Sequence, residues 1–502
     1  MSTYPATKRP SSRPDPDTTL PDAVRWRILA VLLLAMFMSL VGVSIVNVAL
    51  PSIQQALDAS HADIQWVLSG YALTFGVVLV AAGRAGDIMG RGGIFLWGVG
   101  LFTAASLAAG LAPDANWLNA ARFVQGLGSG LLSPQGMGMI QQYFRGAERG
   151  RAFGYLGTTV GFSVAIGPVM GGFLIEVGGL ELGWRLTFLV NIPVGILTFV
   201  LGLRWFPRPL IKRIASLDPQ QPTTLKQALL SLDPLGSLLL GLAVLAVLFP
   251  FVEARSSPLT WWLLPIAGML TVLWIRWERY YENIGHSPMV NLDIFSVPSF
   301  SNGILIMALY FLGMTSIWVL VALYVQMGKG MTALQSGMFG IPSALLSAYA
   351  ADWAGRRVMK YGRKIVIGGL ILGIAGMLLS VVVVFLAEAH LISIWWLTAS
   401  LGLVGLAQGS VISPNQTLTL AEVPLDYAGS SGAIMQTGQR IGTSVGIAVI
   451  TAAVFAVLAM ASWSTAVAIG FGLIALIMGV ALLIAIRDQR QRDQYPVREA
   501  DR

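Results

Sequence analysis

The chain contains no cysteine, only three histidines and few charged residues. Without cysteine it can form no disulfide, no thiolate metal site and no cysteine nucleophile. His61, His286 and His390 fall in expected loops and form no ligand cluster, so we expect no metal and no other cofactor. Only 11% of the 502 residues are charged and 55% are hydrophobic, whereas a soluble domain carries about 25% charged residues. This composition predicts a membrane protein.

Long apolar runs dominate the sequence instead. A helix of roughly 20 apolar residues crosses the ~30 Å hydrocarbon layer and satisfies its own backbone polar groups there. Fourteen runs occur, over about residues 26–50, 64–82, 93–111, 117–140, 152–177, 186–206, 233–253, 259–277, 299–325, 333–354, 364–387, 392–420, 429–460 and 464–486. The sequence therefore predicts an all-α polytopic membrane protein with 14 transmembrane helices and no separate soluble domain.

The placement of Lys and Arg predicts the orientation. Of the 32 basic residues, 27 fall in segments on one expected side and three, Arg185, Arg255 and Lys329, on the other. The last two, Arg122 and Arg440, lie within expected helices. We expect a multi-pass protein of the plasma (inner) membrane with both termini cytoplasmic. The net charge of +8 then reflects basic groups facing anionic lipid, and no nucleic acid is needed to explain it.

Two short motifs recur in the second half of the chain. Gly-Arg pairs at 83–84 and 90–91 return at 355–356 and 362–363, and the string 130–135 is echoed at 410–415. The offsets of 272 and 280 residues exceed the length of six helices, so two further helices lie between two parallel halves. Transporters with a cavity at the membrane midplane are built from such repeats.

This repeat divides the chain into five parts. They are a disordered cytoplasmic tail (1–24), an N-terminal six-helix bundle (25–206), a linker with two inserted helices (207–277), a C-terminal six-helix bundle with its preceding loop (278–486) and a cytoplasmic tail (487–502).

Several strings, in order and on the expected helices, resemble one family. They are IVNVALP at 45–51, GRAGDIMGR at 83–91, RFVQG at 122–126, GPVMGG at 167–172, WRLTFLVNIPVG at 184–195, and GSSG followed by QRIG at 429–442. The chain resembles the major facilitator superfamily, in the fourteen-helix branch of drug:proton antiporters. That resemblance implies the major facilitator fold, two six-helix bundles plus two inserted helices, and a drug-exporting function.

The resemblance also implies gating residues. In the family, Asp87 would clamp the inner side shut by meeting the positive N-terminal end of the helix that begins near Ala428, with Arg91 beside it. The alternative is a local salt bridge to Arg84 or Arg91. Gly167, Pro168 and Gly171 belong to a segment that the family links to exchange and gating. The alternative for these three residues is close helix packing.

Polar stripes on two expected helices indicate a cavity. Arg122, Gln125, Ser129 and Ser133 are spaced 3, 4 and 4 and share one helix face, and Gln436 and Arg440 form a second stripe. A membrane-embedded arginine is costly unless it is paired or faces water, so we expect these residues to line the substrate cavity. Asn47 is a further candidate lining residue. The alternative is that each arginine binds helix carbonyls and ties helices together.

A mid-membrane carboxylate is missing. The family aspartate three positions before IVNVALP is replaced by Gly42. Asp352 and Glu176 are the candidate proton sites that remain, although Arg356, one turn away, offers Asp352 a surface ion pair. Two arginines without an obvious acid favour a neutral or anionic substrate over a cationic one.

Three functions compete on these residues. The first is proton-coupled export of a small hydrophobic or amphiphilic compound by alternating access, as in multidrug efflux, with protons and membrane lipids as further partners. The alternative is an exporter or flippase of an anionic lipid or envelope precursor. The third, a membrane enzyme or sensor, lacks a nucleophile–base pair, a metal cluster and a phosphate-binding loop. We therefore expect a transporter without enzymatic activity.

Overall fold

A computed structural model describes residues 20–211, 232–252, 258–286 and 288–494, and every regular element within these ranges is helical. The N-terminal half holds α1 (Asp22–Ala56), α2 (His61–Met89), α3 (Arg91–Gly110), α4 (Ala115–Tyr143), α5 (Gly146–Leu189) and α6 (Asn191–Trp205). The inserted helices are α8 (Pro234–Val252) and α9 (Leu263–Asn283), joined through η2 (Pro258–Trp262).

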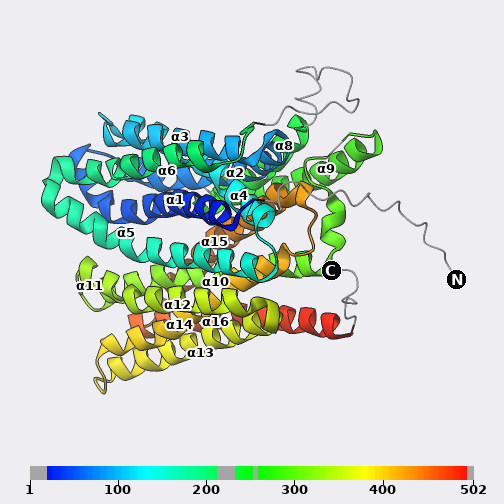
Figure 1. Ribbon diagram of the computed structural model, residues 1–502. Coiled ribbons are helices and arrows are strands. Elements are labelled where there is room, and N and C mark those ends of the chain that lie inside the picture. The colour runs from blue at the N-terminus through cyan, green and yellow to red at the C-terminus, as the bar shows by residue number, and fades with distance from the viewer. Residues whose placement is uncertain (1–19, 212–231, 253–257, 287, 495–502) are drawn as a thin grey trace.

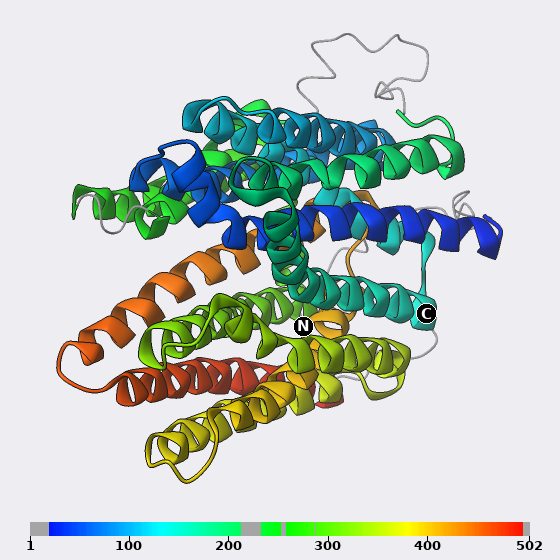
Figure 2. The same cartoon turned by 90° about the vertical axis from the view of Figure 1, so that its left-hand side faces the viewer.

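The C-terminal half is built in the same way. It holds α10 (Pro298–Leu323), α11 (Ala333–Met338), α12 (Gly340–Tyr361), α13 (Arg363–Glu388), α14 (Leu397–Thr419), α15 (Ala428–Leu458) and α16 (Trp463–Gln494). Short helices connect these elements: η3 (Leu292–Ser296), η4 (Tyr324–Gly328), η5 (Ile394–Trp396) and η6 (Leu425–Tyr427). The two halves form separate bundles that lie one above the other in both views (Figures 1 and 2).

Within the described residues the fourteen apolar runs lie on helical elements, with runs 186–206 and 333–354 each divided between two helices, which confirms the all-helical fold class. Eleven helical segments of the described chain are long and apolar enough to cross a membrane. The count is lower because α4 and α12 carry more polar residues and because one continuous segment, 146–205, contains two predicted spans. That segment breaks at Gly179, where φ is 66°. The number of fourteen membrane crossings stays a prediction.

The expected tails differ from the structure at their borders. Helix α1 already begins at Asp22, and α16 continues through 487 to Gln494. A helix that continues into polar sequence gains backbone hydrogen bonds. Hydropathy alone therefore predicts membrane helices that are too short at such ends. The rest of both predicted tails, 1–19 and 495–502, lies outside the described residues.

Glycines set the contacts between the two bundles at one end. We call this end, which carries the basic segments 84–91, 145–151 and 356–364, the inner side. A Cβ added at Gly83 would lie 2.6 Å from the carbonyl oxygen of Gly429, and one at Gly355 would lie 2.5 Å from that of Gly150. Both pairs join opposite halves, α2 to α15 and α5 to α12, at distances that leave no room for a side chain. The backbones can approach this closely because small residues stand at both positions.

Of the two inserted helices, α8 packs against the outside of the contact between α2 and α15. Leu248 of α8 lies against Gly76 of α2, and a core of Leu73, Val244 and Leu248 also touches Ile441 of α15. Helix α8 therefore covers the line along which α2 and α15 meet.

We predict that Gly355→Val loosens the inner side. A valine there must displace the backbone of α5, and overpacking of this kind costs about 1–3 kcal/mol. A single cysteine replacing the buried Val358, in a chain that has no other cysteine, should react faster with a water-soluble maleimide in the Gly355→Val background. Gly368→Val is the matched control, since nothing lies within 4 Å of a Cβ at that glycine of α13. Equal labelling rates in all three proteins would contradict the prediction.

Candidate functional site

Asp87, in the last turn of α2, reaches across to the other half of the molecule. Its Oδ1 accepts a hydrogen bond from the backbone N–H of Gly429 at 2.8 Å, and its Oδ2 accepts one from that of Ser430 at 2.9 Å. The side chain is only 1% exposed. These two N–H groups belong to the first turn of α15, which has no helical partner for them. The carboxylate therefore sits at the positive end of a helix dipole of roughly +0.5 charge.

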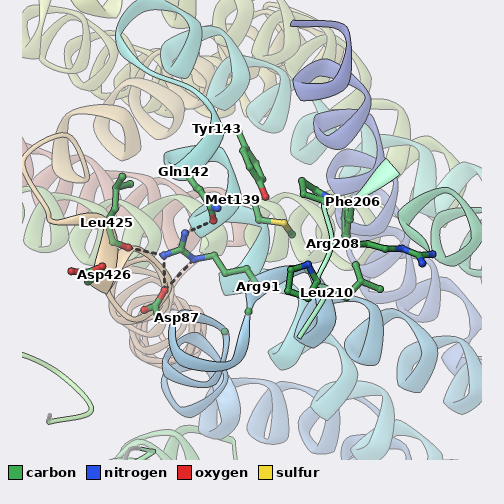
Figure 3. Close-up of a pocket in the computed structure, with 15 residues that line it drawn as sticks. Asp87, Arg91, Met139, Gln142, Tyr143, Phe206, Arg208, Leu210, Leu425 and Asp426 are labelled. Carbon is green, nitrogen blue, oxygen red and sulfur yellow. Dashed lines mark hydrogen bonds and ion pairs between the residues drawn. The ribbon is translucent and has the colours of Figure 1, made fainter. Parts of the chain in front are cut away.

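Arg91 completes this contact from the start of α3 (Figure 3). Its Nη2 lies 2.8 Å from Asp87 Oδ1 and donates to the carbonyl of Leu425 at 2.6 Å, while Nη1 donates to Gln142 at 2.6 Å. The local salt bridge and the contact between halves were alternatives for Asp87 from sequence, and the structure contains both. We call Asp87, Arg91, Gly429 and Ser430 the inner clamp.

The second half of the repeat has no matching clamp. The position equivalent to Asp87 is Met359, which is half-exposed. Arg363, equivalent to Arg91, instead pairs with Asp488 of α16 at 2.7 Å and with Asn415 of α14. That pairing stays within the C-terminal bundle, so the two halves meet asymmetrically on the inner side.

A cavity of about 300 Å³ lies between the halves, beyond the clamp. Gln436, at its inner end, follows Gly429 by seven residues of helix, or about 10 Å at 1.5 Å per residue. The lining residues are Met36, Ser39, Leu40, Val43, Phe75, Ser133, Met137, Leu156, Gly157, Val160, Val164, Tyr310, Phe311, Met314, Thr315, Trp318, Gln408, Ile412, Gln416, Gln436, Gln439, Arg440 and Thr443. Arg440 is the one charged residue in this lining, and no acid belongs to it. We call this space the central cavity.

Polar groups of the central cavity converge on one wall. The Arg440 guanidinium lies over the Phe75 ring, 4.2 Å from its centre. Ser133 donates to Gln436 Oε1 at 2.7 Å, which joins the two halves at the inner end of the cavity. The Tyr310 hydroxyl and Gln439 Nε2 have no hydrogen-bond partner among the described residues. Arg440 thus lines the cavity, whereas the Tyr310 hydroxyl and Gln439 Nε2 are buried in its wall.

Sequence analysis did not select Tyr310 or Gln439. Gln439 precedes the selected Arg440, and the glutamines at 408, 416, 436 and 439 in apolar helices were the signal that could have found this wall. Tyr310 gave no such signal, because a single tyrosine in an apolar run is ordinary.

The expectation that Arg122 faces the cavity is corrected by the structure. Its Nε donates to the Val67 carbonyl at 2.8 Å and its Nη1 to Gln125 at 2.5 Å, and the side chain is 1% exposed. The guanidinium also lies 4.4 Å from the Tyr71 ring centre. Helix α4 packs between α2 and α3, so this part of its polar stripe meets helix carbonyls and neighbouring side chains.

The same packing removes two more expected residues from the cavity lining. Gln125 donates to Ser106 at 2.7 Å, and Ser129 shares hydrogen bonds with Ser39 and Tyr71 at 2.8 and 2.7 Å. Of that stripe only Ser133 lines the cavity. From the second stripe both Gln436 and Arg440 do so.

Asn47 lies just beyond the cavity on α1. It follows the lining residue Val43 by four positions, on the same helix face, and is exposed. It is absent from the lining itself.

Gly167 and Gly171 hold α5 against α1. A Cβ at Gly167 would lie 1.9 Å from Ser44 Oγ, and one at Gly171 would lie 2.9 Å from the Ile45 side chain. Pro168 stands between them inside α5. Close packing therefore accounts for both glycines, and their gating role stays a prediction.

Neither candidate proton site is buried. Asp352 pairs with Arg356 at 2.9 Å, with side chains 37% and 51% exposed, and Glu176 is exposed at the outer part of α5. Position 42 also faces away from the cavity, because a Cβ at Gly42 would lie 3.1 Å from the Phe102 ring.

Comparison with known proteins gives the family. A profile of the Major Facilitator Superfamily matches residues 32–447. The chain is 31% identical over 462 residues to a Streptomyces coelicolor protein named "probable actinorhodin transporter", covering 90% of this chain and 77% of that protein. It is 30% identical over 482 residues to the puromycin resistance protein of Streptomyces alboniger, covering 93% and 91%.

A solved structure shares the fold. The human organic anion transporter MFSD10 superposes with a TM-score of 0.66 at 12% identity, over 93% of this chain and all of that chain. The profile match spans most of the sequence and both halves of the structure. The chain therefore belongs to the major facilitator superfamily of multi-pass membrane transporters.

Proposed function

We propose that this protein exports a small hydrophobic or amphiphilic compound, neutral or anionic, across the cell membrane by alternating access, driven by protons. The observation that carries the proposal is the central cavity, which lies between two bundles, is walled by aromatic and aliphatic side chains and contains Arg440 as its one charge. A largely apolar cavity with a few convergent polar groups is the usual form of a small-molecule site. We place the protein in the fourteen-helix branch of drug:proton antiporters, in the inner membrane with both termini cytoplasmic.

The names of relatives support export in particular. The proteins at 31% and 30% identity are named for actinorhodin transport and puromycin resistance. A third relative, from Streptomyces glaucescens and 28% identical, is named a tetracenomycin C resistance and export protein.

The residues that line the central cavity support a substrate that is neutral or negatively charged. Arg440 lines the cavity with its positive charge, the unpartnered Tyr310 hydroxyl and Gln439 amide are buried in its wall, and no described lining residue presents a carboxylate. A cation would enter a site of its own charge without a counterion, whereas a carboxylate, carbonyl or phenolate oxygen would find hydrogen bonds there.

The inner clamp would act as the gate. Asp87 and Arg91 hold the halves together below the cavity, so their release would open it to the cytoplasm. Gly167, Pro168 and Gly171 would let α1 and α5 move as one unit on the far side. An exporter must alternate between such states, and the clamp is the contact that the inward-facing state has to break.

We expect Arg440→Gln to weaken transport of anionic probes selectively. A hydrogen bond to a charged group contributes about 1.5–3 kcal/mol, which corresponds to a tenfold to hundredfold loss of apparent affinity. The measurement is uptake into inverted vesicles of matched anionic, neutral and cationic fluorescent dyes. Arg276→Gln, an exposed arginine of α9, serves as control and should behave as wild type. An equal loss for all three dyes, or none, would contradict the assignment.

The same vesicles separate the proposal from the alternative on this fold. Dye-dependent proton movement supports a drug:proton antiporter. Exposure of the headgroup of a labelled anionic lipid, without dye-dependent proton movement, would replace it with a lipid exporter or flippase.

Asp87→Asn should slow transport without unfolding the protein. The amide offers one acceptor oxygen in place of two, so one N–H of the first turn of α15 loses its partner and the charge on the helix end is lost. We expect a cost of about 1.5–3 kcal/mol to the closed inner side. Transport rate and thermal stability in detergent are measured together, with Asp426→Asn, a neighbour in η6, as the matched control. Unchanged transport in Asp87→Ala would show that Asp87 has no gating role.

A further inference from the structure

Two acids that the proposed mechanism does not use lie together where the inserted helices reach the inner side. Asp233 directly precedes α8, and Glu278 lies in the last two turns of α9. The two residues are 0% and 1% exposed. They are 45 positions apart in a chain with few acids. Carboxylates are almost never fully buried without a partner. We call Asp233 and Glu278 the acid pair.

One oxygen of each carboxylate is approached by hydrogen-bond donors, and the other has no hydrogen-bond partner among the described residues. Asp233 Oδ1 accepts hydrogen bonds from the Gly236 N–H at 3.0 Å and from the Trp277 indole at 2.8 Å. Glu278 Oε2 faces the Val290 N–H at 3.5 Å, and the Trp274 indole and the Met289 N–H also approach this carboxylate. Asp233 Oδ2 and Glu278 Oε1 have no hydrogen-bond partner among the described residues.

The two leftover oxygens point into the same space. A Cβ on Gly236 would lie 2.1 Å from Asp233 Oδ2 and 2.9 Å from Glu278 Oε1. The oxygens are therefore no more than 5.0 Å apart. Gly236 has no side chain to separate them, so a small rotation of either carboxylate brings them within hydrogen-bond distance.

Two buried carboxylates at this separation cannot both be ionised without a large electrostatic cost. A proton shared between them removes the repulsion and supplies the hydrogen that the two leftover acceptors lack. The geometry therefore favours a pair that holds one proton and one negative charge.

The charged neighbour of the pair belongs to the inner side of α2. Arg84, only 6% exposed, interacts electrostatically with Asp233 and Glu278 as well as with Asp87. Its guanidinium also lies 5.9 Å from the ring centre of Tyr427 in η6 of the other half. Tyr281 of α9 is a further titratable group near the pair in the described part of the chain. Movement of Arg84 as the halves separate would change the positive charge next to both acids.

We propose that Asp233 and Glu278 form a proton-binding carboxylate pair in which a single proton bridges Asp233 Oδ2 and Glu278 Oε1, and that Arg84 links its proton occupancy to the state of the inner clamp. The proton site stands on the geometry alone. Its link to transport rests on the proposed function of a proton-coupled exporter.

Infrared spectroscopy tests the proton site directly. The purified protein at neutral pH should show the C=O stretch of a protonated carboxyl, assigned with isotope-labelled aspartate and glutamate. Asp233→Asn and Glu278→Gln should each remove it, because a bridging proton needs both carboxylates. Glu282→Gln, an exposed glutamate one turn further along α9, should keep it. A wild-type protein without the band, or a band that survives both substitutions, would overturn the proposal.

A steric variant tests the bridging geometry while keeping both acids. Gly236→Ala places a methyl group between the two oxygens, so the band should disappear or shift strongly. Gly268→Ala on α9, where nothing lies within 4 Å of the added Cβ, should leave it in place. An unchanged band in Gly236→Ala would show that the oxygens do not share a proton.

Proton movement in vesicles tests the link to transport separately. If the link holds, both single variants keep dye binding but lose at least tenfold in dye-dependent proton movement. If the variants keep wild-type proton movement, the pair is not linked to transport, and the proton site itself is still decided by the infrared result. A wild-type protein without dye-dependent proton movement would refute the proposed function while the infrared result still decides the site.

Discussion

The carboxylate of Asp87 at the first turn of α15 is the contact on which the arrangement of the two halves depends. It joins an acidic side chain of one bundle to unsatisfied backbone donors of the other, in a position that is 1% exposed. Charge-assisted hydrogen bonds in such a setting are stronger than neutral ones. The glycine contacts beside it bring the backbones close enough for this to happen, and the central cavity is the space left above it. Because the contact has no counterpart in the second half of the repeat, opening the inner side requires only one such cluster to be broken.

The distribution of charge inside the protein separates structural from functional groups. Arg122 and Arg363 are buried and bind partners within their own bundles, so each ties helices together. Arg440 lies over the Phe75 ring and lines the cavity. The buried acids Asp87, Asp233 and Glu278 lie at the inner side and do not line the cavity. Substrate and proton would therefore be handled in different places and connected through the movement of the two halves.

The sequence predicted the helices because a run of apolar residues defines a membrane helix wherever it packs. The contact between Asp87 and the start of α15 was expected from the family resemblance, with a local salt bridge as the alternative. Arg122 was misplaced because helical spacing shows which residues share a face but not what that face meets. Tyr310, Gln439 and the Asp233–Glu278 pair were missed as a site for the same reason. Their proximity arises from tertiary packing, and for the acid pair it depends on the missing side chain of Gly236.

The central claim is that the inner side, closed by Asp87, opens and closes during transport. Spin labels on cysteines replacing Ala147 of α5 and Lys364 of α13, both exposed and on the inner side of opposite halves, report this movement in a chain without other cysteines. In lipid bilayers the distance between the labels should show two populations, and the longer one should grow when a transported dye is added or when Asp87 is replaced by asparagine. A single distance under all of these conditions would contradict the account.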